Sequence, residues 1–406
     1  MIAAVLLGGC VLTPRLPPPP DLVNTAAPIG FSPRIRMLAD DRAQLMRRLP
    51  EIEVGLRSAA GNGPVNMLVL SGGGAYGAFG AGALIGMAKA NKLPPFEVVT
   101  GVSAGALLAP FAFLGPSWDA DLHKVFESRV IQRLQPSIPG GLIKSLLFPQ
   151  GIGGHSSLRK LVDRTFTDSL IAAVARVSAT GRMLIIATTN LDDQETVLWD
   201  MGAIARHGGK AADKLFREVL TASASVPGVF PPVMIRVREG DKTYDEMHVD
   251  GSITTPLFFA PIIAVTMPGA WSKLARANIY VIVNGHLVIQ PAKVPIDTLT
   301  ILRDSFSAET AYKTKGTLGE IAGLARFYHM HLRMTSLPAG YSSGSFLDFH
   351  REHLRQLFRY GEACAEQGEL WTSITAAVKR NLSPYLDETQ ARSACPAVVL
   401  ARDALR

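Results

Sequence analysis

A serine between two glycines is the first residue of the sequence whose surroundings suggest chemistry. Ser103 lies in TGVSAGAL (100–107), where Gly101 and Gly105 complete the pattern G-x-S-x-G. This pattern is typical of a nucleophile elbow, a sharp turn from a strand into a helix at which small neighbours let the serine hydroxyl project. The positive end of the following helix then lies near any oxyanion that forms. The pattern therefore predicts that Ser103 is a nucleophile in acyl transfer.

A glycine-rich segment, LVLSGGGAYGAFGAG (68–82), precedes this serine. Its G-x-G-x-x-G spacing from Gly72 to Gly77 matches a dinucleotide-binding fingerprint, which would indicate an oxidoreductase and needs an acidic residue after the second strand. That strand ends at Ser103 instead, and the next acidic residue is Asp119. The alternative, which we favour, is that backbone amides here form an oxyanion hole, where side chains would block the approach. The predicted oxyanion-hole residues are Gly72, Gly73, Gly74 and Ala75.

A serine nucleophile needs a base, and the segment HVDGS (248–252) offers two. His248 and Asp250 are two residues apart, so on a strand both side chains share a face. A Ser-Asp dyad would use Asp250 alone, whereas His286 could complete a Ser-Asp-His triad. Because an ordinary aspartate has a pKa of about 3.9, Asp250 would need burial to act as a base at neutral pH. We expect the neighbouring Gly251 to permit the close packing that such burial requires.

These groups need a scaffold of alternating strands and helices. From residue 66 onward short apolar runs alternate with helical segments, which indicates βαβ units and a mainly parallel sheet. We expect strands at 66–71, 96–101, 182–191 and 278–285, a helix at 78–90, a hairpin at 231–251 that turns at 239–241, and a mostly helical tail from residue 304, clearest at 351–367. Residues 31–60 are expected to carry a surface helix that Pro50 interrupts.

Three ordered motifs together resemble those of the patatin-like phospholipases. They are G-G-G-x-x-G at 72–77, G-x-S-x-G around Ser103 and D-G at Asp250, and the resemblance covers residues 66–260. It includes TTNLDDQETVLWDMG (188–202) and ASASVPGVFPPV (222–233). It implies a three-layer α/β fold, with a mainly parallel central sheet flanked by helices and a helical C-terminal region.

The same resemblance implies a serine acyl hydrolase that acts on lipid esters. In that reading Ser103 is the nucleophile, Asp250 is the base, the glycine-segment amides form the oxyanion hole, and neither a metal nor an organic cofactor takes part. A catalytically silent envelope or assembly protein on the same fold is the alternative, because intact motifs do not measure turnover.

Two positions depart from the family pattern. Tyr76 stands where members commonly carry Arg or Lys, so the positive charge that could hold a phosphate group is missing. Ser252 stands where Gly or Ala often follows the D-G pair, a small change that leaves the role of Asp250 intact. The head group of the substrate therefore stays open.

The first residues, MIAAVLLGGC, combine a short apolar segment with a cysteine. The segment is too short to span a bilayer, but its end resembles the lipobox of bacterial lipoproteins, in which the cysteine is acylated. We therefore predict lipid attachment at Cys10, a Pro-rich tether after it, and a membrane-anchored protein of the cell envelope, on the periplasmic side of an outer membrane. The expected divisions are a signal segment 1–9, a tether 10–30, an N-terminal helical extension 31–65, a catalytic domain 66–290 and a mainly helical region 291–406 packed on it.

Composition sets the remaining expectations. The 406 residues are 48% hydrophobic and 18% charged, which excludes a disordered chain. The net charge of +7 suits anionic partners, but no dense basic run appears, so we expect lipid and a membrane surface rather than nucleic acid as partners.

Cys364 and Cys395 would form a disulfide in an exported chain if their geometry allows it. Residues 131–154 are a cap near the site, a membrane-contacting surface or a buried connection, and HMHLR (329–333) is too sparse in ligands to predict a metal site.

Overall fold

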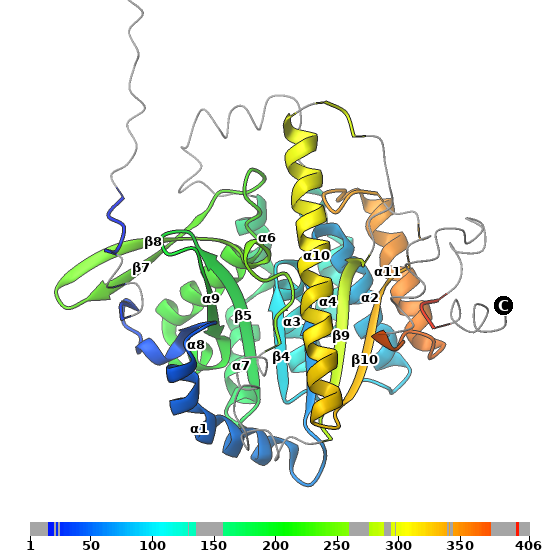
Figure 1. Ribbon diagram of the computed structural model, residues 1–406, viewed down its shortest axis with the longest axis horizontal. Helices are drawn as coiled ribbons and strands as arrows, with labels where there is room; N and C mark the ends of the chain where they lie inside the picture. The colour runs from blue at the N-terminus through cyan, green and yellow to red at the C-terminus, as the bar shows by residue number, and fades with distance from the viewer. Residues whose placement is uncertain are drawn as a thin grey trace, which may run out of the picture.

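A ten-stranded mixed sheet forms the centre of the molecule (Figure 1). The computed structural model describes residues 15–19, 22, 25–128, 130–134, 157–259, 276–287, 294–296, 298–338, 341, 344–374 and 395–397. Within these ranges the sheet follows the order β1-β7-β8-β5-β4-β3-β9-β10, and β6 pairs with both β5 and β2.

Five neighbouring strands are parallel, and they end at the same edge of the sheet, which we call the carboxyl edge. In spatial order they are β10 (His331–Leu337), β9 (Asn278–His286), β3 (Asn66–Leu70), β4 (Val98–Val102) and β5 (Met183–Asn190). The antiparallel strands are β1 (Ala27–Pro28), β2 (Arg36–Leu38), β6 (Glu195–Asp200), β7 (Val233–Glu239) and β8 (Lys242–Asp250). The sequence expectation of a mainly parallel central sheet is confirmed.

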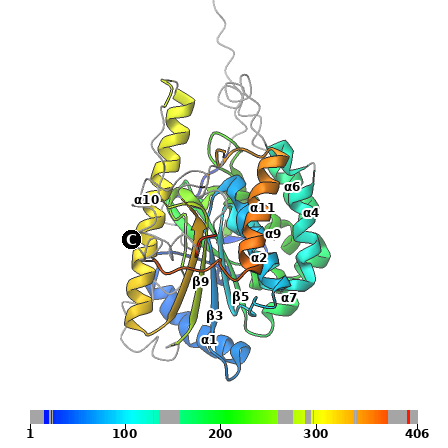
Figure 2. The same cartoon turned by 90° about the vertical axis from the view of Figure 1, so that its right-hand side faces the viewer.

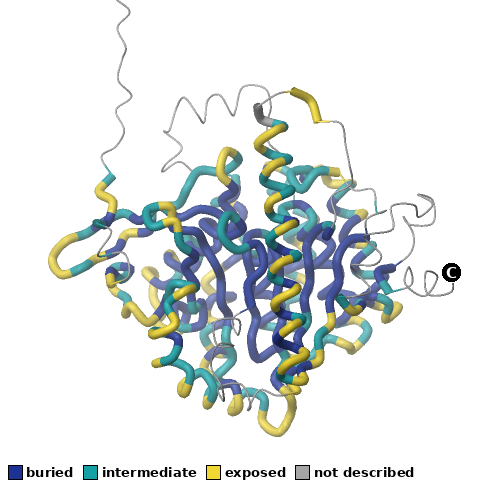
Figure 3. Tube along the Cα trace, in the orientation of Figure 1, coloured by how far each residue is buried: buried dark blue, intermediate teal, exposed yellow. Residues whose placement is uncertain are grey.

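Alternate residues of β3 pack against two different layers of helices. Leu68 and Leu70 belong to one buried apolar cluster, whereas Met67 and Val69 belong to another. Successive side chains of a strand point to opposite faces, so a strand that is apolar at every position must be covered on both. The sheet therefore lies between two helical layers, as Figure 2 shows, and Figure 3 shows its central strands buried along their length.

The two helical layers are unequal. One face is covered by α2 (Gly77–Lys89), α3 (Ala104–Leu114), α4 (Asp119–Glu127), α6 (Ser157–Thr165), α7 (Asp168–Ser178), α8 (Met201–His207), α9 (Gly209–Ser223) and α11 (Arg351–Glu366). The other face is covered by α1 (Arg42–Ala60) and α10 (Thr298–Phe327). The described residues therefore form the three-layer α/β fold that the sequence predicts.

Most of the expected elements occur within a few residues of their predicted positions. The strands β3, β4, β5 and β9, the helix α2 and the helix α11 match the segments expected for them. The hairpin of β7 and β8 turns at Gly240 and Asp241 as predicted. These segments carry long apolar runs or clear turn residues, which are strong local signals.

The N-terminal extension differs from its prediction. Residues 36–38 form strand β2, the helix begins only at Arg42, and Pro50 lies inside the helix rather than interrupting it. Proline removes one backbone donor, but Leu45, Leu49 and Leu56 pack on the sheet on both sides of Pro50. We attribute the continuous helix to that apolar contact, which extends across the missing hydrogen bond.

Besides β1 and β2 in the N-terminal part of the chain, two further strands were not foreseen. The strand β6 lies within the family-like stretch 188–202, and β10 lies within the tail that was expected to be mostly helical. Residues 331–337 pair in parallel with β9 and so extend the sheet at its edge. Their mixed sequence, HLRMTSL, carries little strand signal of its own, and the neighbouring edge of β9 supplies the pairing.

A disulfide joins α11 to a segment that follows it in the sequence. Cys364 and Cys395 are bonded, with their Cα atoms 5.4 Å apart. Closing a loop of this size contributes about 3 kcal/mol by restricting the unfolded chain. The sequence left this disulfide open, and the structure shows the two sulfur atoms bonded.

Several predictions fall on parts of the chain that the structure does not describe. These are the signal segment 1–9, lipid attachment at Cys10, most of the tether 10–30, and residues 135–154 of the expected cap or connection. None of the helices in the described ranges is long and apolar enough to cross a bilayer.

Candidate active site

The turn after β4 has the geometry of a nucleophile elbow. Ser103 follows the last residue of the strand, precedes the first residue of α3, and has a backbone φ of 54° and ψ of −122°. A positive φ is uncommon for a residue with a side chain, and it persists only where the surroundings enforce it. A Cβ on Gly101 would lie 2.6 Å from the carbonyl oxygen of Gly105, so the turn admits only glycine there. The strained backbone presents the Ser103 side chain at the carboxyl edge of the sheet.

Ser103 and Asp250 meet at this edge although they lie 147 residues apart. The Ser103 hydroxyl donates to Asp250 Oδ2 at 2.6 Å. Asp250 is the last residue of β8, which pairs with β5, and β5 in turn pairs with β4. Ser103 is 5% exposed and Asp250 is fully buried. The sheet thus places a hydroxyl and a carboxylate in direct contact in a site shielded from bulk water.

The environment of Asp250 makes it a stronger base than an ordinary aspartate. Burial disfavours the charged carboxylate and raises its pKa from 3.8 to about 6, while hydrogen bonds from Ser103 and from the Ser252 amide oppose the rise. The Ser252 amide donates to Asp250 Oδ1 at 2.8 Å. A Cβ on Gly251 would lie 2.5 Å from the Ala187 carbonyl oxygen, so glycine permits the close packing that excludes water. Asp250 is therefore ionised at neutral pH and able to accept a proton.

The glycine segment after β3 faces the serine but offers fewer free amides than expected. The Gly72 amide donates to the Pro256 carbonyl at 2.9 Å, and the Ala75 amide donates to the Phe346 carbonyl at 2.7 Å. Among the described residues, the amides of Gly73 and Gly74 have no hydrogen-bond acceptor. The candidate oxyanion hole is thereby narrowed from four residues to the amides of Gly73 and Gly74.

Strand β9 holds the glycine segment in place. Asn284 donates from its backbone amide to Ser71 Oγ at 2.8 Å and from its side-chain amide to the Ser71 carbonyl at 2.7 Å. A Cβ on Gly73 would lie 1.7 Å from the Asn284 carbonyl oxygen, so no other residue fits at this position. These contacts preorganise the two available amides, which is what electrostatic stabilisation of an oxyanion requires.

A loop of the C-terminal region lies across the same segment. The Tyr76 hydroxyl donates to the Gly344 carbonyl at 2.5 Å, next to the bond between Ala75 and the Phe346 carbonyl. The Tyr76 ring also packs edge-on against His286, with centroids 5.6 Å apart. The residue that stands in place of the family's usual cation thus binds the Gly344 carbonyl through its hydroxyl.

Neither histidine that the sequence offered as a base contacts the dyad. The ring of His248 is fully buried, with Nδ1 at 3.0 Å from Thr188 Oγ1 and Nε2 at 3.2 Å from Glu246 Oε2. His286 Nδ1 lies 3.0 Å from the Pro338 carbonyl oxygen. The geometry therefore favours a Ser-Asp pair over a Ser-Asp-His triad.

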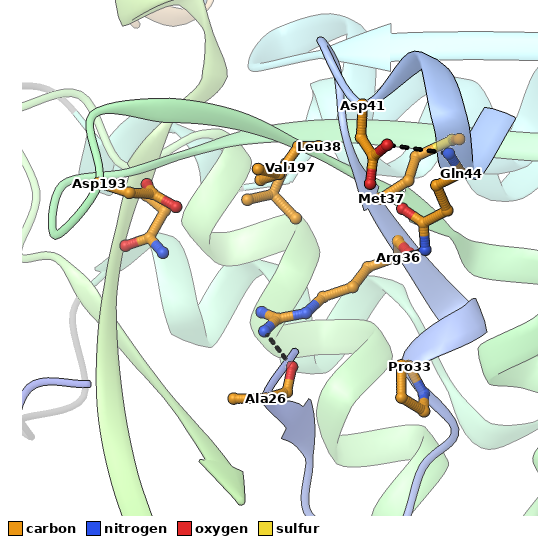
Figure 4. Close-up of a pocket in the computed structure, with 10 residues that line it drawn as sticks. Ala26, Pro33, Arg36, Met37, Leu38, Asp41, Gln44, Asp193 and Val197 are labelled. Atoms are coloured by element: carbon orange, nitrogen blue, oxygen red, sulfur yellow. Dashed lines mark hydrogen bonds between the residues drawn. The ribbon is translucent and has the colours of Figure 1, made fainter. Parts of the chain in front are cut away.

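The partners of His248 form a buried ionic network around Arg36. The Arg36 guanidinium contacts both carboxylate oxygens of Glu246, one of them at 2.8 Å, and donates to the Ala26 carbonyl at 2.7 Å. Figure 4 shows Arg36 in the wall of a small polar pocket. That pocket is lined by Ala26, Pro33, Arg36, Met37, Leu38, Asp41, Gln44, Asn190, Asp193 and Val197. It includes neither residue of the dyad.

Sequence reasoning missed two residues that support the site, Ser223 and Asn284. Ser223 accepts from the Ser103 amide at 3.0 Å and donates to the Ala187 carbonyl at 2.7 Å, which fixes the elbow. Asn284 supports the glycine segment, and Ser252 Oγ is buried without a partner in the described structure. Ser223 lies in the family-like stretch 222–233, so that stretch was its only signal. No group of three or more His, Cys, Asp or Glu side chains that could hold a metal ion occurs in the part of the chain described.

The fold and the site together define an α/β protein with a serine–aspartate pair at a nucleophile elbow. Residues 68–261 match the family model described as patatin-like phospholipase. The match covers a little under half of the chain, and at family level it supports lipid acyl hydrolysis as the class of activity. No curated protein sequence matches the chain.

Two solved structures resemble the chain distantly. VipD from Legionella pneumophila is 14% identical, with a TM-score of 0.33, over 75% of this chain and 67% of that one. The human GIVD cytosolic phospholipase A2 is 13% identical, with a TM-score of 0.29, over 68% of this chain and 51% of that one. The match thus spans about half the length of the human protein, and neither likeness assigns a residue here.

Proposed function

We propose that the protein is a serine acyl hydrolase of lipid esters that works through a Ser103–Asp250 dyad. The observation that carries this proposal is the 2.6 Å hydrogen bond from the Ser103 hydroxyl to the buried Asp250 carboxylate. It occurs at a strained elbow, beside two amides with no acceptor in the described structure. Burial raises the pKa of Asp250 to about 6, which leaves it ionised at neutral pH and basic enough to take part in proton transfer.

The reaction follows from these positions. Ser103 Oγ attacks the ester carbonyl carbon while its proton passes to Asp250, and the Gly73 and Gly74 amides stabilise the oxyanion. The C–O bond to the leaving alcohol breaks, the proton passes from Asp250 to that alcohol, and an acyl-enzyme remains. Water then attacks the acyl-enzyme, gives up a proton to Asp250, and releases the fatty acid while Ser103 recovers its proton. No step requires a metal or an organic cofactor.

The test compares variants on a panel of phospholipids, lysophospholipids, acylglycerols and short p-nitrophenyl esters. Ser103→Ala and Asp250→Asn should each lower kcat/KM on the order of 10³-fold or more, because each removes a group that acts in every turnover. Ser169→Ala, the same substitution at an exposed serine of α7, should leave the rates unchanged. Equal and negligible rates for all four proteins would instead favour a catalytically silent envelope protein.

A further inference from the structure

Helix α10 starts at the carboxyl edge, where the dyad lies. The strand β9 ends there at His286, α10 follows at Thr298–Phe327, and β10 then runs parallel to β9. The helix must therefore descend from the carboxyl edge to the opposite edge. Figures 1 and 2 show its first turns standing above the other described helices.

Two contacts fix α10 beside the dyad. The ring of Phe306 lies 5.9 Å from that of Phe346, whose carbonyl accepts from the Ala75 amide in the glycine segment. About two turns further along, the Lys313 ammonium donates to the carbonyl of Ile253 at 2.6 Å, and Ile253 lies three residues after Asp250. Residues 306–313 thus pass alongside the site, and the residues before Phe306 extend beyond it. At 1.5 Å per residue, the eight helical residues from Thr298 extend roughly 12 Å.

The projecting end exposes large apolar side chains. We call the exposed residues Val294, Ile296, Ile301 and Leu302 the α10 tip. Ile296 is 100% exposed, Leu302 63% and Ile301 45%. A cluster of exposed aliphatic side chains costs free energy in water, so such clusters mark surfaces that bind a partner.

The described chain also begins at the carboxyl edge. Arg15 forms an ion pair with Asp192, which follows the carboxyl end of β5, and the Leu16 carbonyl accepts from the Asp245 amide. Cys10, the predicted site of acylation, lies only five residues before Arg15. The chain that would carry a lipid anchor therefore joins the fold at the same edge as the α10 tip.

We propose that the α10 tip docks on a lipid bilayer and turns the carboxyl edge toward the membrane. Apolar side chains at the end of a helix can enter the boundary between head groups and acyl chains, to a depth of about 5–10 Å. A second copy of the chain is a poorer occupant, because a stable interface needs about 800 Å² from each partner and the tip offers only a few side chains. The use of this docking for catalysis rests on the proposed lipid hydrolase function, but the docking itself does not.

The test measures binding of the full chain to phosphatidylcholine vesicles by flotation, with Cys10→Ser in every protein so that acylation plays no part. The variant Ile301→Asp/Leu302→Asp should bind roughly tenfold more weakly or worse, because two aliphatic side chains that would enter the bilayer are replaced by charged ones. The control Val54→Asp/Phe327→Asp adds the same charge at side chains that are 69% and 74% exposed and lie away from the carboxyl edge. It should bind as the wild type does, and both variants should hydrolyse a soluble short ester at the wild-type rate.

Three results would overturn the docking proposal. Equal binding of the two double variants would mean that the tip does not contact lipid, as would a wild type that fails to float. A wild-type dimer in sedimentation that only the tip variant dissociates would assign the surface to a second copy. A missing activity on soluble ester in every protein would refute the hydrolase proposal alone, since flotation does not depend on turnover.

Discussion

Two buried carboxylates of β8, Glu246 and Asp250, lie four residues apart, and their pKa values are shifted in opposite directions. Both side chains are fully buried. Burial alone would raise the pKa of Glu246, but hydrogen bonds from Arg36 and His248 outweigh it and lower that pKa to about 2. Asp250 receives hydrogen bonds only from neutral donors among its described partners, and burial raises its pKa to about 6.

The difference shows how one strand can serve stability and chemistry. Glu246 is neutralised by a cation from β2, so it joins the N-terminal extension to the sheet and stays ionised. Asp250 is buried with no cation in hydrogen-bond contact, so its charge is costly and a proton is readily accepted. A carboxylate paired with arginine would be too weak a base for Ser103.

The largest expected effect comes from removing the charge of Glu246. Glu246→Gln leaves the Arg36 guanidinium buried without its counter-ion and should lower the free energy of unfolding by about 3–5 kcal/mol in urea titrations. The double variant Arg36→Met/Glu246→Leu should recover most of that loss, because it removes both charges together. Asp245→Asn, at the exposed pair of Asp245 with Arg236, should change stability by less than about 1 kcal/mol. A Glu246→Gln protein as stable as the wild type would refute a structural role for the ion pair.

A second prediction concerns the pH dependence of stability at Asp250. Because its folded pKa of about 6 exceeds the usual 3.8, the folded state binds the proton more tightly than the unfolded state does. The stabilisation that comes from binding this proton is therefore complete below pH 3.8 and is lost as the pH rises through 6. Over that range the free energy of unfolding falls by about 3 kcal/mol. Asp250→Asn removes this titration, so the variant should gain about that much stability relative to the wild type between pH 4 and pH 8. Denaturant titrations across that range would check it, and a difference independent of pH would contradict the raised pKa.

The smallest expected effect tests the oxyanion side of the site while both carboxylates stay intact. Tyr76→Phe removes the hydroxyl that donates to the Gly344 carbonyl and so loosens the loop beside the Ala75–Phe346 hydrogen bond. Loss of about 1 kcal/mol of transition-state stabilisation should lower kcat about fivefold, with little change in KM for a soluble ester. The acidic limb of the pH profile should stay near 6, since Asp250 is untouched. Tyr312→Phe, at a tyrosine 73% exposed on α10, is the matched control and should have no effect.

The sequence predicted the fold best where local signals are strong. Apolar runs located β3, β4, β5 and β9, and the turn at Gly240 located the β7–β8 hairpin. The strand β10 was missed because its residues become a strand only by pairing with β9. The continuous helix through Pro50 was missed because its apolar packing against the sheet is not a local property.

The candidate site divides in the same way. Spacing singled out Ser103 and the glycine segment, since each motif is short and contiguous, whereas the choice of Asp250 over His248 as the base came from the resemblance to the patatin-like family. The reduction of the oxyanion hole to Gly73 and Gly74 could not be predicted, because the acceptors for the other two amides come from Pro256 and Phe346, far along the chain.

The sequence by itself determined which groups are available for chemistry: a serine in an elbow, an aspartate before a glycine, and a segment too rich in glycine to carry side chains. Only the tertiary structure decided how those groups behave. Strand pairing brings Asp250 to Ser103, and Arg36 pairs with Glu246 rather than with Asp250. A pKa and a free amide depend on neighbours that are distant in the chain, so they arise only when the chain has folded.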